Sequence, residues 1–225
     1  MFIVLEGLDG AGKSTQLEAL KKYLIEKNHK VKFIHFPQTT SPIYSELIAK
    51  FLRGELGSIE NVNPYLVALL YAGDRNATKE TIQNWINDGY TVIADRYVFS
   101  NIAFQCAKST SEEEKEKLAD WILKTEYEDF KIPKPNLSLF LDVPLSFTKK
   151  QLSNNREGED RAYLQGATDI HEADLSFQEN VRKVYLKQVN IHSDFKRIDC
   201  TNSNGEMSSP TEIFKKILPL VEEIL

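Results

Sequence analysis

Residues 2–15 of this 225-residue chain read FIVLEGLDGAGKST, an apolar run followed by a glycine-rich turn and the polar start of a helix. Within this stretch, Gly7, Gly12, Lys13 and Ser14 satisfy G-x-x-x-x-G-K-[ST], the pattern of a phosphate-binding loop. The glycines let backbone N–H groups point inward at phosphates, and a helix beginning near Lys13 adds the positive end of its dipole. An ordinary strand-to-helix turn is the alternative, and the strand before and helix after the loop favour the phosphate site.

The loop predicts several contacts to a nucleotide. We expect Lys13 to reach the β- and γ-phosphate oxygens as a point charge, and the Ser14 hydroxyl to hold Mg²⁺. The predicted nucleotide-binding residues are Gly7, Gly10, Ala11, Gly12, Lys13, Ser14 and Thr15.

Composition narrows the class of protein. A chain with 41% hydrophobic residues can bury the core of one globular domain, so we expect a single domain over residues 1–225. The net charge of −5 gives no general attraction for nucleic acid, so a bound anion needs a locally basic pocket. Two cysteines, Cys106 and Cys200, are too few for a disulfide framework and favour buried thiols in a reducing compartment. No apolar run approaches the ~20 residues of a membrane span, and we expect a cytoplasmic protein.

Hydrophobic periodicity predicts alternating strands and helices. Strands are expected before the loop and at 31–36, 91–94, 137–141 and 195–200, and helices at 14–27, 43–53, 64–88, 112–125, 175–189 and 210–225. Five strands alternating with helices predict an α/β fold, with a parallel sheet covered on both faces and ligands at the carboxyl ends of the strands. Residues 153–174 carry charge and glycine without an apolar period, and predict a mobile loop.

A second group of residues lies where the predicted strands end. Asp95, Arg96 and Tyr97 follow the third strand, and phosphoryl transfer needs cations around both phosphates. Tyr71 and Arg75 lie four residues apart on the long helix and therefore share a face. A ring and a guanidinium together suit a nucleotide base, through stacking and hydrogen bonds. The alternative is a half-buried Tyr71 beside a surface arginine.

The sequence resembles the thymidylate kinase family over nearly its whole length. The motifs that carry the resemblance are the loop itself, FP at 36–37, LLYAGDR at 69–75, DRYVFSNIAFQ at 95–105 and PKPNLSLFLDV at 133–143. The D-R-Y-x-x-S-x-x-A-[FY] run is far more particular to this family than the loop. The resemblance implies the fold of the P-loop NTPases with a lid at about 153–174, and transfer of the γ-phosphoryl group of ATP to thymidine 5′-monophosphate.

The resemblance also implies roles for single residues. Asp9 matches an acidic residue near the acceptor sugar and the metal, and Arg96 matches the arginine that bridges the donor and acceptor phosphates. Tyr71 matches the aromatic residue that stacks on thymine, and Arg75 the arginine that bonds its exocyclic oxygen. Asn101 matches a side chain facing the N3 edge of the base. The remaining substrate-binding positions are Phe36, Pro37, Ser100, Phe104 and Glu172.

Two of these roles have structural alternatives. Phe104 occupies the position that crowds a ribose 2′-hydroxyl in the family and so favours deoxynucleotides, but it is equally a residue of the hydrophobic core. Asn101 has the side chain of a helix cap as well as that of a base-binding residue. Both alternatives remain open at this point.

One position departs from part of the family. A branch of the family has an arginine between the aspartate and alanine of the loop, where this chain has Gly10. The resemblance then implies that Arg156 or Arg161, in the predicted lid, supplies the missing charge to the transferring phosphoryl group. Glu172 and Asp174 are both candidates for the acid that the family places near the sugar or metal. The family is usually homodimeric, and the helix from Pro64 could supply the interface.

Three other functions compete with this prediction. A deoxynucleoside kinase shares the loop and the arginine but needs a general base for a sugar hydroxyl. A nucleotide-dependent switch is a second alternative, although the N-K-x-D run typical of guanine-specific switches is not in the sequence. An inactive kinase that serves as a scaffold is the third, and the presence of Asp9, Lys13, Ser14 and Arg96 argues against it.

Overall fold

A computed structural model describes residues 1–39, 41, 43–59, 61–153 and 175–225. Five parallel strands form one sheet in the order β2-β3-β1-β4-β5. The strands are β1 (Phe2–Gly7), β2 (Val31–His35), β3 (Thr91–Asp95), β4 (Leu137–Asp142) and β5 (Phe195–Asp199). The predicted parallel α/β sheet is therefore confirmed.

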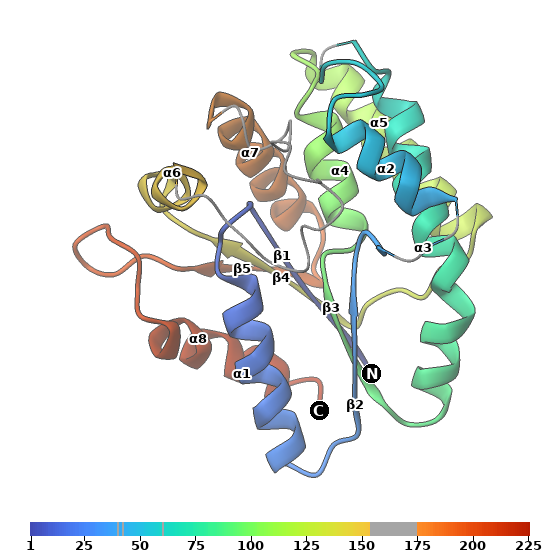
Figure 1. Cartoon of the computed structure of the whole chain (residues 1–225). Coiled ribbons are helices and arrows are strands. Elements are labelled where there is room, and N and C mark those ends of the chain that lie inside the picture. Colours follow the sequence, from blue (N-terminus) through green and yellow to red (C-terminus); the bar gives the residue numbers. More distant parts are fainter. Residues whose placement is uncertain (40, 42, 60, 154–174) are drawn as a thin grey trace.

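Helices cover both faces of the sheet (Figure 1). One face carries α1 (Lys13–Glu26) and α8 (Pro210–Glu222), which pack on the side chains of Ile3, Leu5 and Leu139. The other face carries α3 (Pro64–Asn87), α4 (Val98–Cys106), α5 (Glu112–Leu123) and α7 (Leu175–Ile191), around Val4 and Phe140. Because successive strand residues point to opposite faces, the two cores draw on alternate positions of β1.

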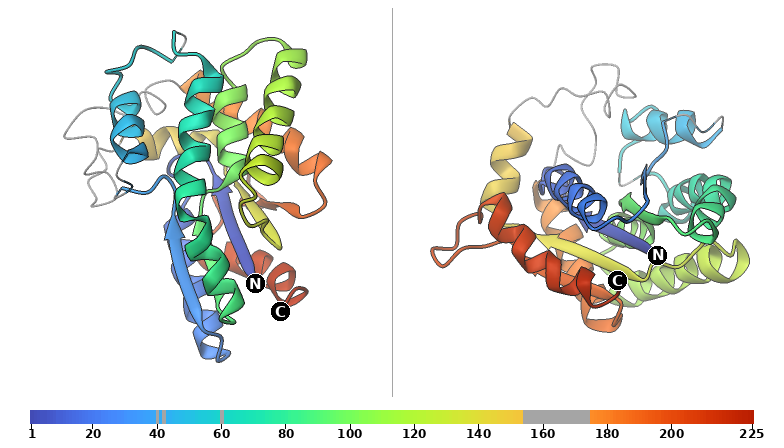
Figure 2. Two further views of the ribbon diagram at one scale, coloured as in Figure 1. Left: turned by 90° about the vertical axis from the view of Figure 1, so that its right-hand side faces the viewer. Right: turned by 90° about the horizontal axis from the view of Figure 1, so that it is seen from below.

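Three smaller helices complete the chain. Helix α2 (Tyr44–Leu52) packs on α3 through a separate apolar cluster that includes Ile48, Phe51 and Val67. A π-helix, η1 (Lys124–Asp129), continues α5, and α6 (Leu145–Ser153) follows β4. Figure 2 shows the two chain ends side by side near one end of the molecule. No helix in the described ranges is both long and apolar enough to cross a bilayer.

The predicted elements agree with the observed ones within a few residues at their ends. Asn63 caps α3 by accepting a hydrogen bond from the Tyr65 N–H at 2.9 Å, with Pro64 in the first helical position, as predicted. The predicted helix at 112–125 is corrected at its end, because α5 stops at Leu123 and the chain widens into η1. Helices α4 and α6 and the π-helix were not predicted from the sequence. The predicted lid at 153–174 lies outside the described residues, except for Ser153 at the end of α6.

Strand β1 organises the sheet. It is the central strand, fully buried from Phe2 to Gly7, and β3 and β4 pair with its two sides. The chain reaches β2 and β3 on one side of β1 and β4 and β5 on the other. In sheets of this kind, ligands bind beside the carboxyl ends of the strands where the connections diverge. The loop after β1 lies at that point.

Candidate active site

The loop between β1 and α1 has the backbone that its glycines allow. Gly10 and Gly12 have φ values of 75° and 80°, in the left-handed region that side chains rarely adopt. Gly7 lies close to both the loop and β4, since a Cβ atom there would stand 3.2 Å from the Ala11 Cβ and 3.4 Å from the Leu141 carbonyl oxygen. Ser14 and Thr15 are exposed at the first turn of α1, where the helix leaves N–H groups free for an anion.

Lys13 folds back over this loop. Its ammonium donates a hydrogen bond to the Leu8 carbonyl at 3.1 Å, and the side chain is buried. Burial and the nearby positive charge of Arg96 together lower the pKa of Lys13 to about 8, against the opposing effect of Asp95 and Asp9. The loop therefore holds a cation that loses its proton more readily than an ordinary lysine.

Arg96 joins the loop to the end of β3. It has a φ of 65°, an uncommon conformation for a residue with a side chain, which turns the chain sharply out of the strand. Its guanidinium donates to Asp9 Oδ1 at 2.7 Å, to the Gly7 carbonyl at 2.8 Å and to Ser100 Oγ at 3.1 Å. Burial alone would lower the pKa of Arg96, but Asp9 and the other acids nearby raise it, so the cation is permanent.

Glu6 helps to hold Arg96 in place through the residues that follow it in the chain. Its buried carboxylate accepts hydrogen bonds from the Tyr97 N–H at 2.9 Å and the Ser100 N–H at 3.2 Å, at the start of α4. The hydroxyls of Ser100 and Tyr185 also donate to Glu6 Oε2. Burial raises the pKa of Glu6, although the hydrogen bonds from Ser100 and the Tyr97 N–H and the charge of Arg96 oppose the shift. A carboxylate from β1 thus caps α4 and fixes Ser100, which in turn holds Arg96.

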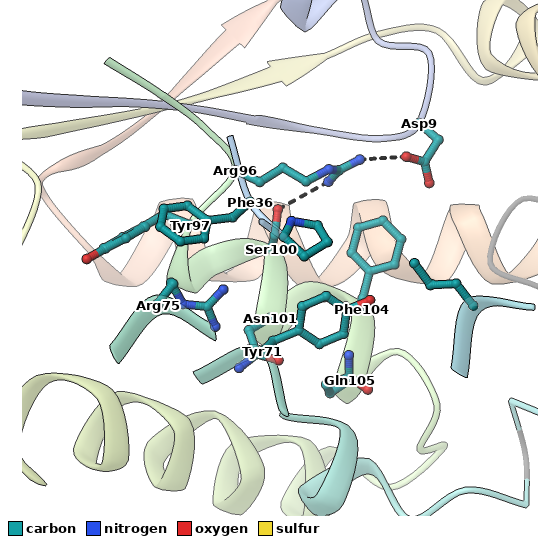
Figure 3. A pocket seen from close by; sticks show the side chains of 12 residues that line it. Asp9, Phe36, Tyr71, Arg75, Arg96, Tyr97, Ser100, Asn101, Phe104 and Gln105 are labelled. Carbon is teal, nitrogen blue, oxygen red and sulfur yellow. Dashed lines mark hydrogen bonds and ion pairs between the residues drawn. The ribbon is translucent and has the colours of Figure 1, made fainter. Parts of the chain in front are cut away.

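A cavity with about 530 Å³ of empty space, part of it open to solvent, lies beside this arginine (Figure 3). Its walls come from the loop, the turn after β2, α2, α3 and α4. The lining residues are Asp9, Phe36, Pro37, Leu52, Tyr71, Arg75, Arg96, Tyr97, Ser100, Asn101, Phe104 and Gln105.

The structure brings almost all predicted substrate-binding residues into this one cavity. Asp9, Phe36, Pro37, Tyr71, Arg75, Arg96, Ser100, Asn101 and Phe104 all line it. The Arg96 guanidinium carbon lies 5.1 Å from the centre of the Phe104 ring. Arg156, Arg161, Glu172 and Asp174, the predicted lid residues, lie outside the described residues.

The structure bears on the alternative interpretations of three residues. Arg75 is not a surface arginine, because it is only 1% exposed and pairs with the buried Glu126 through Nε at 2.5 Å and Nη2 at 2.6 Å. Asn101 does not cap a helix, because it lies in the middle of α4. Phe104 is both a core residue and a lining residue, so its two interpretations are not exclusive.

Sequence reasoning missed two residues of this region. Gln105 lines the cavity, is 1% exposed, and has no hydrogen-bond partner for either amide atom among the described residues. The family-like run at 95–105 contains Gln105, but nothing in its spacing separates a lining glutamine from a core one. Glu126 lies 51 residues after Arg75, and no local pattern connects them.

The fit of Mg²⁺ to this edge can be tested on the donor atoms present. Asp95 Oδ1 is buried without a hydrogen-bond partner in the described part of the chain, and Lys13 and His35 hold the pKa of Asp95 below its ordinary value against burial. The Ser14 hydroxyl is exposed. Within the described ranges no three acids, histidines or cysteines cluster as a metal cage. A site with only a few protein oxygen atoms fits Mg²⁺, because Mg²⁺ usually retains several water ligands and is also coordinated by the phosphates of the substrate.

Comparisons with known proteins identify the family that the chain resembles. A model of the family described as thymidylate kinase matches residues 5–210. A thymidylate kinase of Mycobacterium tuberculosis is 32% identical over 187 residues, covering 83% of this chain and 85% of its own. A thymidylate kinase of Thermosipho africanus is 32% identical over 227 residues, which cover 100% of this chain and 99% of that protein.

A solved structure extends the likeness to the fold. The structure of a thymidylate kinase from Candida albicans superposes with a TM-score of 0.72 at 26% identity, covering 99% of this chain and 91% of that one. The family model spans the phosphate-binding loop, β3 and β4, and the match to the Thermosipho africanus relative covers the whole chain. The chain therefore belongs to the thymidylate kinase family, whose members are nucleoside monophosphate kinases.

Proposed function

We propose that this protein transfers the γ-phosphoryl group of ATP to thymidine 5′-monophosphate (dTMP), with Mg²⁺ as cofactor, and releases ADP and the diphosphate. The observation that carries the proposal is the cavity lined by Asp9 of the loop, which combines aromatic side chains with two arginines from different elements. An acceptor that is already an anion needs such cations, whereas a sugar hydroxyl needs a general base.

Tyr71 and Arg75 form the base-binding part of the proposed site. Tyr71 stacks on the thymine ring, and Arg75 donates to its exocyclic oxygen. Arg75 uses Nε and Nη2 for Glu126, so Nη1 is the nitrogen left for the base. Phe36, Pro37 and Phe104, which line the cavity, enclose the sugar and base. Phe104 would crowd a ribose 2′-hydroxyl and so favour deoxynucleotides.

The charged part of the site neutralises the transferring group. Lys13 and the loop amides of Gly7 to Thr15 hold the phosphates of ATP, and Arg96 bridges donor and acceptor phosphates. Asp9, which pairs with Arg96 at 2.7 Å, would then lie beside the acceptor sugar. A Mg²⁺ ion held by Ser14 and Asp95, with Asp9 nearby, would compensate phosphate charge. A lid arginine, Arg156 or Arg161, would complete the set.

The homodimer and the cytoplasmic location also remain proposals. Leu66 and Leu69 are 63% and 41% exposed on α3, the helix that we predicted to supply the dimer interface. They provide apolar surface on which a second copy of the chain could pack. The single domain over residues 1–225 is a further expectation.

An acceptor panel tests the proposed activity. The purified protein with ATP and Mg²⁺ is given dTMP, thymidine or no acceptor, and ADP and thymidine diphosphate are quantified by chromatography. We expect one ADP per diphosphate formed, and only with dTMP. ADP formed with thymidine would identify a nucleoside kinase instead. ADP release at the same rate with and without an acceptor would indicate a nucleotide-dependent switch. If no ADP forms under any condition, the protein is an inactive scaffold.

A further inference from the structure

Glu126, on the π-helix η1, contacts Arg75 and Asn101, two residues that line the cavity and form what is called here the base-binding wall. Its carboxylate is 0% exposed and accepts hydrogen bonds from Arg75 Nε at 2.5 Å and Arg75 Nη2 at 2.6 Å. Its Oε1 also accepts from Asn101 Nδ2 at 2.9 Å. One buried carboxylate therefore connects α3 and α4 at the floor of the cavity, where Figure 3 shows Arg75 and Asn101 next to each other.

These contacts fix which way the Asn101 amide faces. The same atom that approaches Glu126 also lies 3.0 Å from the Ala68 carbonyl oxygen. Both neighbours are acceptors only, so this atom must be the amide nitrogen, and both of its hydrogens are used. Asn101 Oδ1 is left as a buried acceptor with no partner in the described part of the chain. A ligand N–H group would satisfy it.

Arg75 has the opposite polarity. Glu126 engages Nε and Nη2, and no hydrogen bond of the described residues engages Nη1. Burial alone would lower the pKa of Arg75, but Glu126 raises it, so this group is always a donor. The wall thus presents one fixed donor and one fixed acceptor to the same cavity.

A pyrimidine base meets this wall with its C4 substituent and N3. Thymine and uracil offer an oxygen at C4 and N3–H, an acceptor and a donor, which match Nη1 of Arg75 and Oδ1 of Asn101. Cytosine offers an amino group at C4 and a bare N3, and so reverses both. A site built for one polarity strongly rejects the reverse, because its buried polar groups then stay unpaired.

We propose that Glu126 is a positioning residue that sets the hydrogen-bond polarity of Arg75 and Asn101 and thereby selects 4-oxo pyrimidine monophosphates over 4-amino ones. The proposal rests on the proposed function of the cavity. Gln105 is the competing source of selectivity, since it lines the same cavity. Both of its amide atoms lack partners among the described residues, so nothing fixes its orientation, and it can adapt to either base.

Replacement of the carboxylate by an amide tests this role. In E126Q the new amide nitrogen faces an Arg75 donor in either orientation, because Arg75 donates to both oxygens of Glu126. At the Oε1 position it also faces the Asn101 amide, which must then turn its nitrogen toward the base. The measurement is kcat/KM for dTMP and for deoxycytidine monophosphate (dCMP) at saturating ATP. We expect the dTMP to dCMP ratio to fall at least tenfold, with the affinity for ATP unchanged. E128Q, an exposed substitution on the same π-helix, is the matched control and should keep the wild-type ratio.

A double-mutant cycle separates positioning from general damage. N101L removes the acceptor while leaving the pair of Arg75 and Glu126 intact, and should lower the ratio by itself. Because Glu126 acts through Arg75 as well as Asn101, the E126Q/N101L protein should have a lower ratio than N101L, but the decrease should be smaller than the two single effects combined. A folded E126Q protein with the wild-type ratio overturns the proposal, and so do additive effects.

Two further outcomes are decisive. If E126Q does not fold, N101L alone decides, because an unchanged ratio in N101L overturns the proposal and a lowered ratio supports it. A wild-type protein that is inactive on dTMP overturns the proposed function and this inference together. A wild type that prefers dTMP, with a ratio that E126Q leaves unchanged, overturns this inference alone.

Discussion

Lys13 and Arg96 carry the positive charge at the edge of the sheet, and they differ in how firmly they hold it. Arg96 is surrounded by Asp9, Asp95 and Glu6, which raise its pKa. Lys13 is buried, and its pKa is lowered to about 8. A change of pH in the slightly alkaline range therefore removes one cation of the site and leaves the other.

The value for Lys13 predicts a pH profile. We expect kcat/KM for ATP to fall as the pH rises through about 8, because the uncharged amine binds phosphate oxygens poorly. Stability should change in the opposite direction. The folded protein holds this proton more weakly than the unfolded chain, so between about pH 8 and 10.5 the Lys13 contribution to the free energy of unfolding increases with pH.

The measurement is kcat/KM between pH 6.5 and 9.5, with thermal unfolding recorded on the same samples. K13R is the control, because an arginine keeps its charge over this range and should lack the alkaline decrease, at a lower overall rate. A flat wild-type profile, or an equal decrease in K13R, would contradict the assignment.

Arg75 shows what the sequence could and could not predict about a single site residue. Its distance of four residues from Tyr71 predicted correctly that both side chains share a face, and both line the cavity. The spacing could not predict that Arg75 is buried, because its partner Glu126 comes from another helix. Gln105 was missed because its importance depends on unpartnered atoms in a cavity, which only the assembled fold reveals.

Helices were predictable from the sequence where one of their faces meets water. The helices α1, α3, α7 and α8 have buried residues at helical spacing, and the sequence located them. Helix α4 was missed because every one of its residues is buried, so it has no polar face and no period to detect. The π-helix was missed because its wider turns break the period on which the prediction relies.

The packing of α2 against α3 depends on a residue without a side chain. A Cβ atom at Gly73, in the middle of α3, would lie 2.2 Å from Tyr44 Cε1 and 2.4 Å from its Cζ. In a free helix, alanine is more stable than glycine by about 1 kcal/mol. Here the ring of Tyr44 has to move, and overpacking of this kind costs about 1–3 kcal/mol.

We therefore expect G73A to lower the free energy of unfolding in urea, against the helix propensity of alanine. The double variant Y44A/G73A removes the obstructing ring and should show a non-additive recovery relative to the two single variants. A G73A protein that is more stable than the wild type by about 1 kcal/mol would mean that α2 does not pack on α3 in this way.

The fold of the whole molecule brings segments that are distant in the sequence together at the carboxyl-terminal edge of the sheet. Asp9, Arg75, Arg96 and Asn101 come from the loop after β1, from α3, from the end of β3 and from α4. The parallel arrangement of the strands, which the alternation of strands and helices predicted, gathers these segments. The order of the strands and the contacts between helices could not be derived from spacing, since they depend on packing over the entire sheet.

The most direct test of the account is a crystal structure of the protein with dTMP and a non-hydrolysable ATP analogue. We predict thymine stacked on Tyr71 with its C4 oxygen at Arg75 Nη1. The 5′-phosphate should lie at Arg96 and point toward the γ-phosphate held by Lys13. A base bound outside the cavity lined by Tyr71 and Arg75, or an Arg96 that touches neither phosphate, would contradict the account.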